Sequence, residues 1–192
     1  MTRFWWVRHG PTHARSMVGW SDVPADLSDT AALARLDGYL PKGALLVSSD
    51  LARAIATADV LDASRQRLRH DPALREIHFG TWEMRPFAEV EAETPDQIRA
   101  FWNTPGDVRP PDGESWNDLS ARVNAAIDRL LAAHQGRDIV VVAHFGAILA
   151  ALQRAERLSP EAVFAHRIDN LSVTSMSHQG SGWQSHVINH TP

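Results

Sequence analysis

Two histidines and two arginines of this sequence lie where short apolar segments end, and together they could bind and transfer a phosphate group. Arg8 and His9 follow one such segment, His144 follows another, and Arg53 lies shortly after a third. Arginine forks bind phosphate oxygens in bidentate geometry, and a neutral imidazole can act as a nucleophile. The sequence therefore predicts phosphoryl transfer with His9 as the nucleophile and all four side chains on the phosphate.

The proton for the leaving group requires a further residue, because an alkoxide leaves poorly without one. Glu76 is a carboxylate just before the glycine turn at Gly80. We predict that it acts as general acid and then as general base for water. Glu83 lies nearby and is the second candidate for this role. His144 is predicted to donate a hydrogen bond to the phosphoryl group and completes the expected catalytic set.

Metal and thiolate chemistry fit this chain poorly. His9 and His13 are four residues apart, but the intervening Gly10-Pro11 disfavours the helix that would bring both rings onto one face. The chain contains no cysteine, which excludes a cysteine nucleophile. We expect metal-independent catalysis with no cofactor.

These side chains require a scaffold in which strand ends meet. The apolar runs predict strands at 4–8, 44–48 and 139–143, helices at 51–61, 115–134 and 147–153, and a terminal hairpin from 171–177 and 183–188. Alternating strands and helices favour an α/β fold, a three-layer sandwich with a mainly parallel central sheet and helices on both faces. Such sheets place their sites beyond the carboxyl ends of the strands.

The length of 192 residues fits a single domain, 1–192, with no internal boundary. The stretch 85–113 differs from the rest because it contains five prolines between short helical fragments near Glu89 and Ile98. We predict that it forms an insertion over the site.

The composition also limits the partners. A formal net charge of -4 does not favour nucleic acid or an anionic membrane. No apolar stretch approaches the length of a membrane span, and no signal peptide is evident, so the expected location is cytoplasmic. The expected partner is a small-molecule phosphate ester, and the oligomeric state stays open.

With these residues in place, the chain resembles the histidine phosphatase superfamily, also called phosphoglycerate-mutase-like. The resemblance spans nearly the whole chain and rests on ordered blocks, which are 8–12, 19–24, 48–54, Glu76, Gly80 to Glu83, 111–115, 142–144 and 170–172. It implies an α/β sandwich in which His9 is phosphorylated, Arg8, Arg53 and His144 hold the phosphate, and Glu76 handles the proton.

Two positions depart from the family pattern near the expected substrate. Arg15 stands where many members carry an asparagine, and Phe145 stands where a glycine usually follows the histidine. Together with Trp20 and Glu83, they are the candidate substrate-binding residues.

The leading prediction is a phosphomonoesterase acting on a small phosphorylated metabolite through a phosphohistidine. The first alternative is a phosphoglycerate-type mutase, although the mutases of this family have more chain between their glutamate and second histidine. The second alternative is a non-catalytic phosphate-ligand-binding protein, since a fold does not fix a function.

Overall fold

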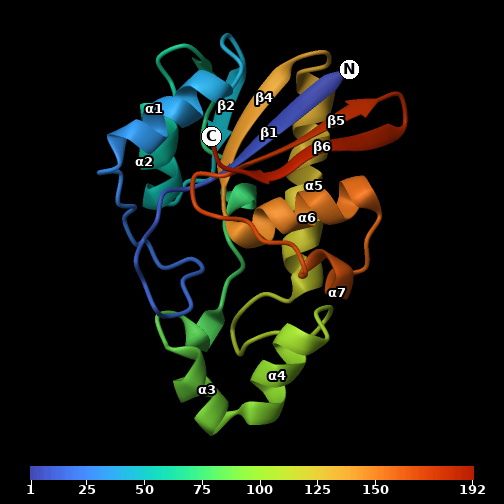
Figure 1. Cartoon of the computed structure of the whole chain (residues 1–192). Coiled ribbons are helices and arrows are strands. Elements are labelled where there is room, and N and C mark those ends of the chain that lie inside the picture. Colours follow the sequence, from blue (N-terminus) through green and yellow to red (C-terminus); the bar gives the residue numbers. More distant parts are fainter.

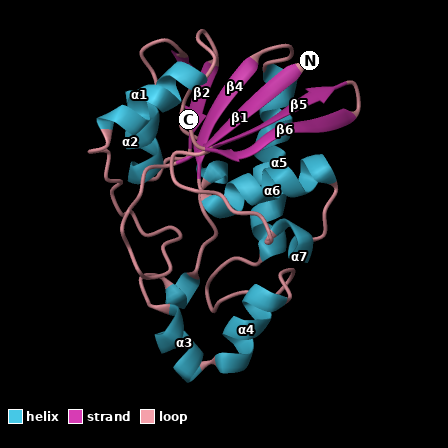
Figure 2. Cartoon of the chain, viewed as in Figure 1, coloured by secondary structure: helices cyan, strands magenta, loops and turns pink.

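The computed structural model describes residues 1–192 and contains one six-stranded sheet flanked by helices (Figures 1 and 2). The elements in chain order are β1 (Thr2–Arg8), α1 (Thr30–Tyr39), β2 (Leu45–Ser48), α2 (Ala52–Val60), β3 (Gln66–Arg67), α3 (Phe87–Glu93), α4 (Pro95–Asn103), α5 (Trp116–Ala133), β4 (Asp138–Ala143), α6 (Phe145–Glu156), α7 (Pro160–Val163), β5 (Val173–Gln179) and β6 (Gly182–His190). Two 3₁₀ turns, Pro72–Leu74 and Gly80–Trp82, lie between β3 and α3.

The sheet is mixed and mainly parallel, with strand order β3-β2-β4-β1-β5-β6. Strands β1, β2 and β4 run parallel to one another, and β2 also pairs parallel with β3. The terminal hairpin of β5 and β6 adds antiparallel pairs at the other edge. As a consequence, β1, β2 and β4 all end on the same edge of the sheet (Figure 1).

Each face of the sheet packs against its own layer of helices, which confirms the predicted three-layer sandwich. Alternate residues of β1 show this, since Phe4 and Trp6 join the larger apolar cluster with α5 and α6, whereas Val7 joins the smaller one with α1 and α2. In β4, Val141 and Val140 divide in the same way. Near-continuous apolar strands are expected where both faces of a parallel sheet are covered.

The longest predicted helix is confirmed as α5. It begins with a capping box in which the Ser115 hydroxyl accepts from the Asp118 N–H and the Asp118 carboxylate accepts from the Ser115 N–H. Helix α6 extends beyond the predicted range 147–153 at both ends, because it begins directly at Phe145 and continues to Glu156. Helix α1 and strand β3 are absent from the sequence prediction.

The proline-rich stretch 85–113 contains α3 and α4, which lie beyond the edge where β1 and β4 end (Figure 1). Val90, Ile98 and Phe101 of this stretch are buried in the larger apolar cluster, so it packs onto the body of the fold. No helix is long and apolar enough to span a membrane.

Candidate active site

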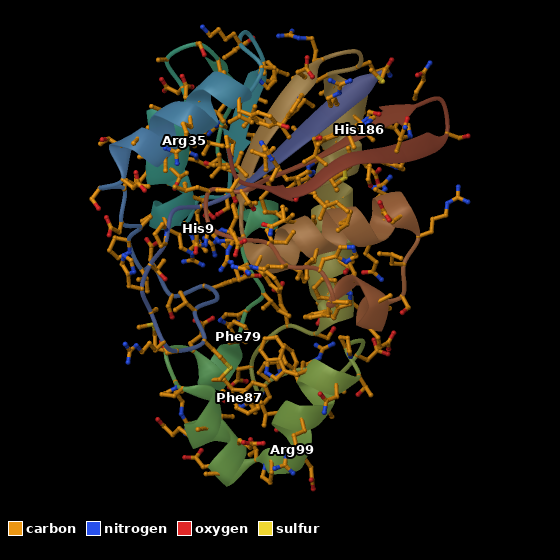
Figure 3. The ribbon with its side chains drawn as sticks, viewed as in Figure 1. His9, Arg35, Phe79, Phe87, Arg99 and His186 are labelled. Carbon is orange, nitrogen blue, oxygen red and sulfur yellow. The ribbon has the colours of Figure 1, made fainter.

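The two histidines predicted for catalysis face each other at the shared strand edge. His9 follows β1 and His144 follows β4, and their ring centroids are 5.0 Å apart. Both rings are buried, with residue exposures of 6% and 0%. Figure 3 shows His9 at this edge, facing the side on which Phe79 and the helices α3 and α4 lie.

The His9 ring is held in one tautomer. Its Nδ1 lies 2.7 Å from the Gly10 carbonyl oxygen, which can only accept, so Nδ1 carries the ring proton. The other nitrogen, Nε2, keeps its lone pair and lies 3.3 Å from the donating Nε of Arg53. Burial, reinforced by the nearby charge of Arg53, lowers the pKa of His9 to about 3. The ring is therefore neutral at physiological pH, with Nε2 available as a nucleophile.

His144 is oriented by a serine that the sequence prediction did not single out. The Ser49 hydroxyl lies 2.7 Å from His144 Nε2 and also accepts from the Leu51 N–H. This chain of bonds favours a hydroxyl proton directed at Nε2, which places the ring proton on Nδ1, where no protein acceptor is present. Burial, together with the charges around it, lowers the pKa of His144 well below its usual value.

Arg53 is fixed by backbone carbonyls of the loop between β1 and α1. Its Nη1 donates to the Ser21 oxygen at 2.9 Å and its Nη2 to the Gly19 oxygen at 2.6 Å. The guanidinium is almost fully buried, at 1% exposure, without a salt bridge of its own. A buried cation without a paired anion favours an anionic ligand.

Arg8 supplies a second cation at the same edge. Its Nη1 donates to the Ile168 oxygen at 2.6 Å, and its buried Nε has no partner. The N-terminus of α2 lies near these arginines and is partly occupied by the protein itself, because the Ala52 N–H donates to Asp22 at 2.7 Å.

Glu76 lies against the start of α6 and is buried at 8% exposure. Its carboxylate accepts from the Gly146 N–H at 3.0 and 3.1 Å and from its own neighbour, the Ile77 N–H, at 2.9 Å. Burial lowers the pKa values of Arg8 and Arg53, and the negative charge of the Glu76 carboxylate opposes part of this shift. Glu76 is thus brought together with the predicted phosphate-binding residues.

The backbone of Glu76 is held by two side chains that stack on each other. Trp20 Nε1 and Arg122 Nη2 donate to the Glu76 carbonyl oxygen at 2.8 and 2.7 Å. The Trp20 ring also packs between Arg75, 4.7 Å from its centroid, and His78, at 4.6 Å. Trp20, a predicted substrate-binding residue, therefore has contacts that position the glutamate.

Glu83 is directed into the protein scaffold. Its carboxylate accepts from the N–H groups of Gly19, Trp20, Ser21 and Phe79 and from the Ser21 hydroxyl, over 2.6 to 3.2 Å. Burial raises the pKa of Glu83, but these hydrogen bonds together lower it by more, so the net shift of the pKa is downward. The same loop carries the carbonyls that hold Arg53, so Glu83 supports that arginine indirectly.

Of the remaining predicted residues, some lie beside the phosphate-binding cluster and others lie at the surface. Phe145 lies beside the phosphate-binding residues, with the Arg8 guanidinium carbon 5.6 Å from its ring centroid. Arg15 is exposed and forms no hydrogen bond or ion pair with the cluster. His13 turns to the surface and pairs with Asp26 at 2.8 Å. No group of three or more potential metal-binding side chains is arranged around an ion site.

Three supporting residues were missed from the sequence. Ser49 had a weak signal, as a hydroxyl residue directly after a strand. Asn170 lies in the block 170–172 that supports the resemblance, but no role was assigned to it; its Nδ2 donates to the His9 backbone oxygen at 2.8 Å. Arg122 had almost no signal, because it resembles any arginine of an amphipathic helix.

Two buried neutral imidazoles between two guanidinium groups, at the carboxyl edge of a parallel sheet, form a site suited to a phosphoryl group. Comparison with known proteins agrees, and the chain belongs to the histidine phosphatase superfamily, branch 1, whose model matches residues 4–191.

Several known proteins are similar over nearly their full lengths. A probable phosphoglycerate mutase, GpmB, of Yersinia pestis (strain Pestoides F) is 31% identical over 95% of this chain and 88% of its own. A putative alpha-ribazole-5'-P phosphatase from Escherichia coli is 27% identical, with a TM-score of 0.86 over 99% and 97% of the two chains. A mycobacterial glucosyl-3-phosphoglycerate phosphatase, solved with inorganic phosphate, is 30% identical, with a TM-score of 0.85 over 98% and 97%.

Proposed function

We propose that this protein is a phosphomonoesterase that hydrolyses a small phosphorylated compound through a phosphohistidine on His9. The observation that carries the proposal is the state of His9, whose buried ring keeps its proton on Nδ1 and leaves the Nε2 lone pair beside Arg53 at 3.3 Å. A nucleophile of this kind, next to donors for the equatorial oxygens, meets the main requirements of phosphoryl transfer.

In the first half-reaction, the Nε2 lone pair of His9 attacks phosphorus and forms the P–N bond while the P–O bond to the leaving group breaks. Glu76 enters this step as the protonated carboxylic acid and gives that proton to the departing oxygen, so the alcohol leaves neutral and Glu76 becomes a carboxylate. Arg8, Arg53 and the Nδ1–H of His144 neutralise the three phosphoryl oxygens.

In the second half-reaction, Glu76 is a carboxylate and accepts a proton from the attacking water. The water oxygen forms a bond to phosphorus, the P–N bond breaks, and the electron pair returns to His9. The sum is one ester and one water giving one alcohol and inorganic phosphate, with His9 and Glu76 restored. No step requires a metal ion.

The names of the similar proteins support a phosphate ester as the substrate. Two of the three are phosphatases by name, one was solved with inorganic phosphate, and all match this chain over almost its whole length. The similarity to a probable phosphoglycerate mutase favours a second candidate, in which the phosphohistidine returns its phosphoryl group to the substrate skeleton.

The test is a panel of phosphorylated metabolites and one aryl phosphate, assayed with a chelator present, for the wild type, His9→Ala and the exposed control His13→Ala. We expect phosphate release by the wild type and His13→Ala and none by His9→Ala. Activity that appears only with added divalent metal would overturn the mechanism. Conversion of 3-phosphoglycerate to 2-phosphoglycerate faster than phosphate release would establish the mutase instead.

A further inference from the structure

An apolar pocket opens next to the phosphate-binding residues, between α4, α5, α6 and α7. Its volume is about 50 Å³, and its walls are mostly aromatic. The residues that shape it are Ile77, Phe79, Trp102, Trp116, Leu119 and Phe164. Their rings form a connected cluster, with Trp102 6.1 Å from Phe79 and 6.4 Å from Phe164, and Phe164 4.7 Å from Trp116.

This pocket is continuous with the candidate active site. Glu76 and Gly146 belong to both, and Glu76 is the carboxylate expected to face the leaving-group oxygen. Phe145 forms the boundary, since its ring lines the pocket and lies 5.6 Å from the Arg8 guanidinium carbon. A phosphate ester bound by its phosphoryl group therefore has the pocket within reach of its alcohol part.

The chemistry of the walls selects the kind of alcohol. Glu76 is the only ionisable side chain that lines the pocket, so no cation there could bind a carboxylate or a second phosphate. Small-molecule sites are typically apolar with a few polar groups that fix orientation. One such group is present, because the buried Nε1 of Trp102 has no acceptor, whereas that of Trp116 donates to Gln153 at 2.8 Å.

We propose that this pocket binds the leaving group of the substrate, and that the preferred substrates are monophosphate esters of uncharged aromatic or extended apolar alcohols. The proposal rests on the proposed function for the position of the phosphoryl group. It disfavours phosphoglycerates, whose carboxylate would enter an apolar space with no cation to pair with it.

The first experiment measures binding without turnover. Methyl-, butyl-, hexyl- and phenethylphosphonate cannot be hydrolysed, and their affinities are obtained by calorimetry, with 2-carboxyethylphosphonate as the charged comparison. We expect the affinity to rise with apolar size, by up to about fourfold per methylene, the limit set by burying a CH₂ group. The carboxylate compound should bind about tenfold more weakly than butylphosphonate or worse.

The second experiment measures kcat/KM for the matching alkyl phosphates. Primary alkyl alcohols have similar leaving-group acidity, so the chemical step changes little along the series and the binding contribution is isolated. The fold-increase in kcat/KM for each added methylene should match the fold-increase in phosphonate affinity for the same methylene.

Variants locate the effect. Trp102→Ala removes one aromatic wall and should reduce the increment per methylene, and Trp102→Phe should restore most of it. Trp183→Ala is the matched control, because this half-buried tryptophan lies on β6 and packs against Phe4 and His178, away from the pocket. Its increment should equal that of the wild type.

The outcomes separate the two proposals. If phosphonate affinity does not depend on apolar size, or if Trp102→Ala and Trp183→Ala have equal increments, the pocket proposal is wrong even though phosphate release may be intact. If the affinities rise as expected but no ester is hydrolysed, the pocket proposal stands and the phosphatase proposal fails. Preference for the carboxylate compound overturns the pocket proposal directly.

Discussion

His9 owes its reactivity to the balance between burial and positive charge. Burial in a site that also holds Arg53 lowers the pKa of its imidazole to about 3, and the Gly10 carbonyl fixes the proton on Nδ1. The two arginines that attract a phosphate thus also keep the nucleophile neutral. An imidazole at the surface would be partly protonated near neutrality, so its Nε2 lone pair would be available in only part of the molecules.

At Glu76, we predict that Glu76→Gln slows the hydrolysis of alkyl phosphates far more than that of nitrophenyl phosphate. An alkoxide needs the proton that the amide cannot supply, whereas nitrophenolate leaves without it. Single-turnover rates for both esters measure the difference, which should reach about 10²-fold. Equal losses for the two esters would remove Glu76 from the proton-transfer role.

At Glu83, we predict that Glu83→Gln weakens phosphate binding without direct contact with phosphate. The carboxylate accepts five hydrogen bonds from Gly19, Trp20, Ser21 and Phe79, and an amide would direct an N–H at one of these donors. The loop carbonyls that hold Arg53 should shift, which raises the inhibition constant of inorganic phosphate, and unfolding stability should fall by about 1–3 kcal/mol.

The control for Glu83 is Glu93→Gln, at an exposed position paired with Arg85. Glu93→Gln should leave both the inhibition constant of inorganic phosphate and the unfolding stability nearly unchanged, since surface ion pairs contribute little to stability. An unchanged inhibition constant in Glu83→Gln would show that this network does not support Arg53.

At the scale of elements, helix α6 does more than cover the sheet. Its N-terminus follows His144 directly, and its second residue, Gly146, offers a free N–H to the Glu76 carboxylate. The first N–H groups of a helix have no partner within it, and the helix dipole favours an anion there. One helix start thus positions both a histidine and the glutamate.

We predict that Gly146→Ala displaces Glu76. A Cβ at this position would lie 2.3 Å from Glu76 Oε1 and 3.0 Å from the Leu119 side chain. The expected result is a drop in kcat for alkyl phosphates of at least about tenfold, with a smaller effect on nitrophenyl phosphate, whose leaving group needs no proton. The measurement is kcat for both esters.

Helix α1 provides the matched control, because Gly38 lies within it and a Cβ there would contact nothing within 4 Å. Gly38→Ala should leave kcat unchanged and stabilise the fold by about 0.5–1 kcal/mol. Full alkyl phosphatase activity in Gly146→Ala would argue against the placement of Glu76 by this helix.

At the scale of the whole molecule, the buried histidines make the free energy of unfolding depend on pH. The folded pKa of His9 is about 3, below the unfolded value near 6.5. The unfolded chain therefore binds the extra proton as the pH falls through 6.5, and stability decreases down to the folded pKa. His144 shifts in the same direction. We predict that His9 alone contributes a loss of ~1.2 kcal/mol between pH 6 and 5.

The measurement is urea unfolding at pH 7.5, 6.0 and 5.0 for the wild type and His9→Asn. The variant should lose less stability between pH 6.0 and 5.0, by ~1.2 kcal/mol, because one buried imidazole is gone. Equal losses in the two proteins would mean that His9 is not held neutral by the fold.

The fold class and the residues at the strand ends could be predicted from the amino-acid sequence. The apolar runs that end at Arg8, at Ser48 and before His144 are local patterns, and parallel strands covered on both faces must be apolar along their length. The Ser115 capping box and the terminal hairpin were also readable, because both depend on residues close together in the chain. Helix α1 was not, since its buried face is narrow, with Leu33 and Leu36.

Which polar side chains face the site, and which of them support it, depends on contacts formed in the folded protein. Glu76 and Glu83 are equivalent as a sequence pattern. In the fold, Glu76 lies against the start of α6, whereas the Glu83 carboxylate accepts hydrogen bonds from backbone N–H groups of the 19–21 loop. The contact between Ser49 and His144 joins residues 95 positions apart. Such pairings depend on how strands and helices pack across the sheet, which local patterns do not encode, and so the neutral state of His9 and the apolar pocket beside it appear only in the folded chain.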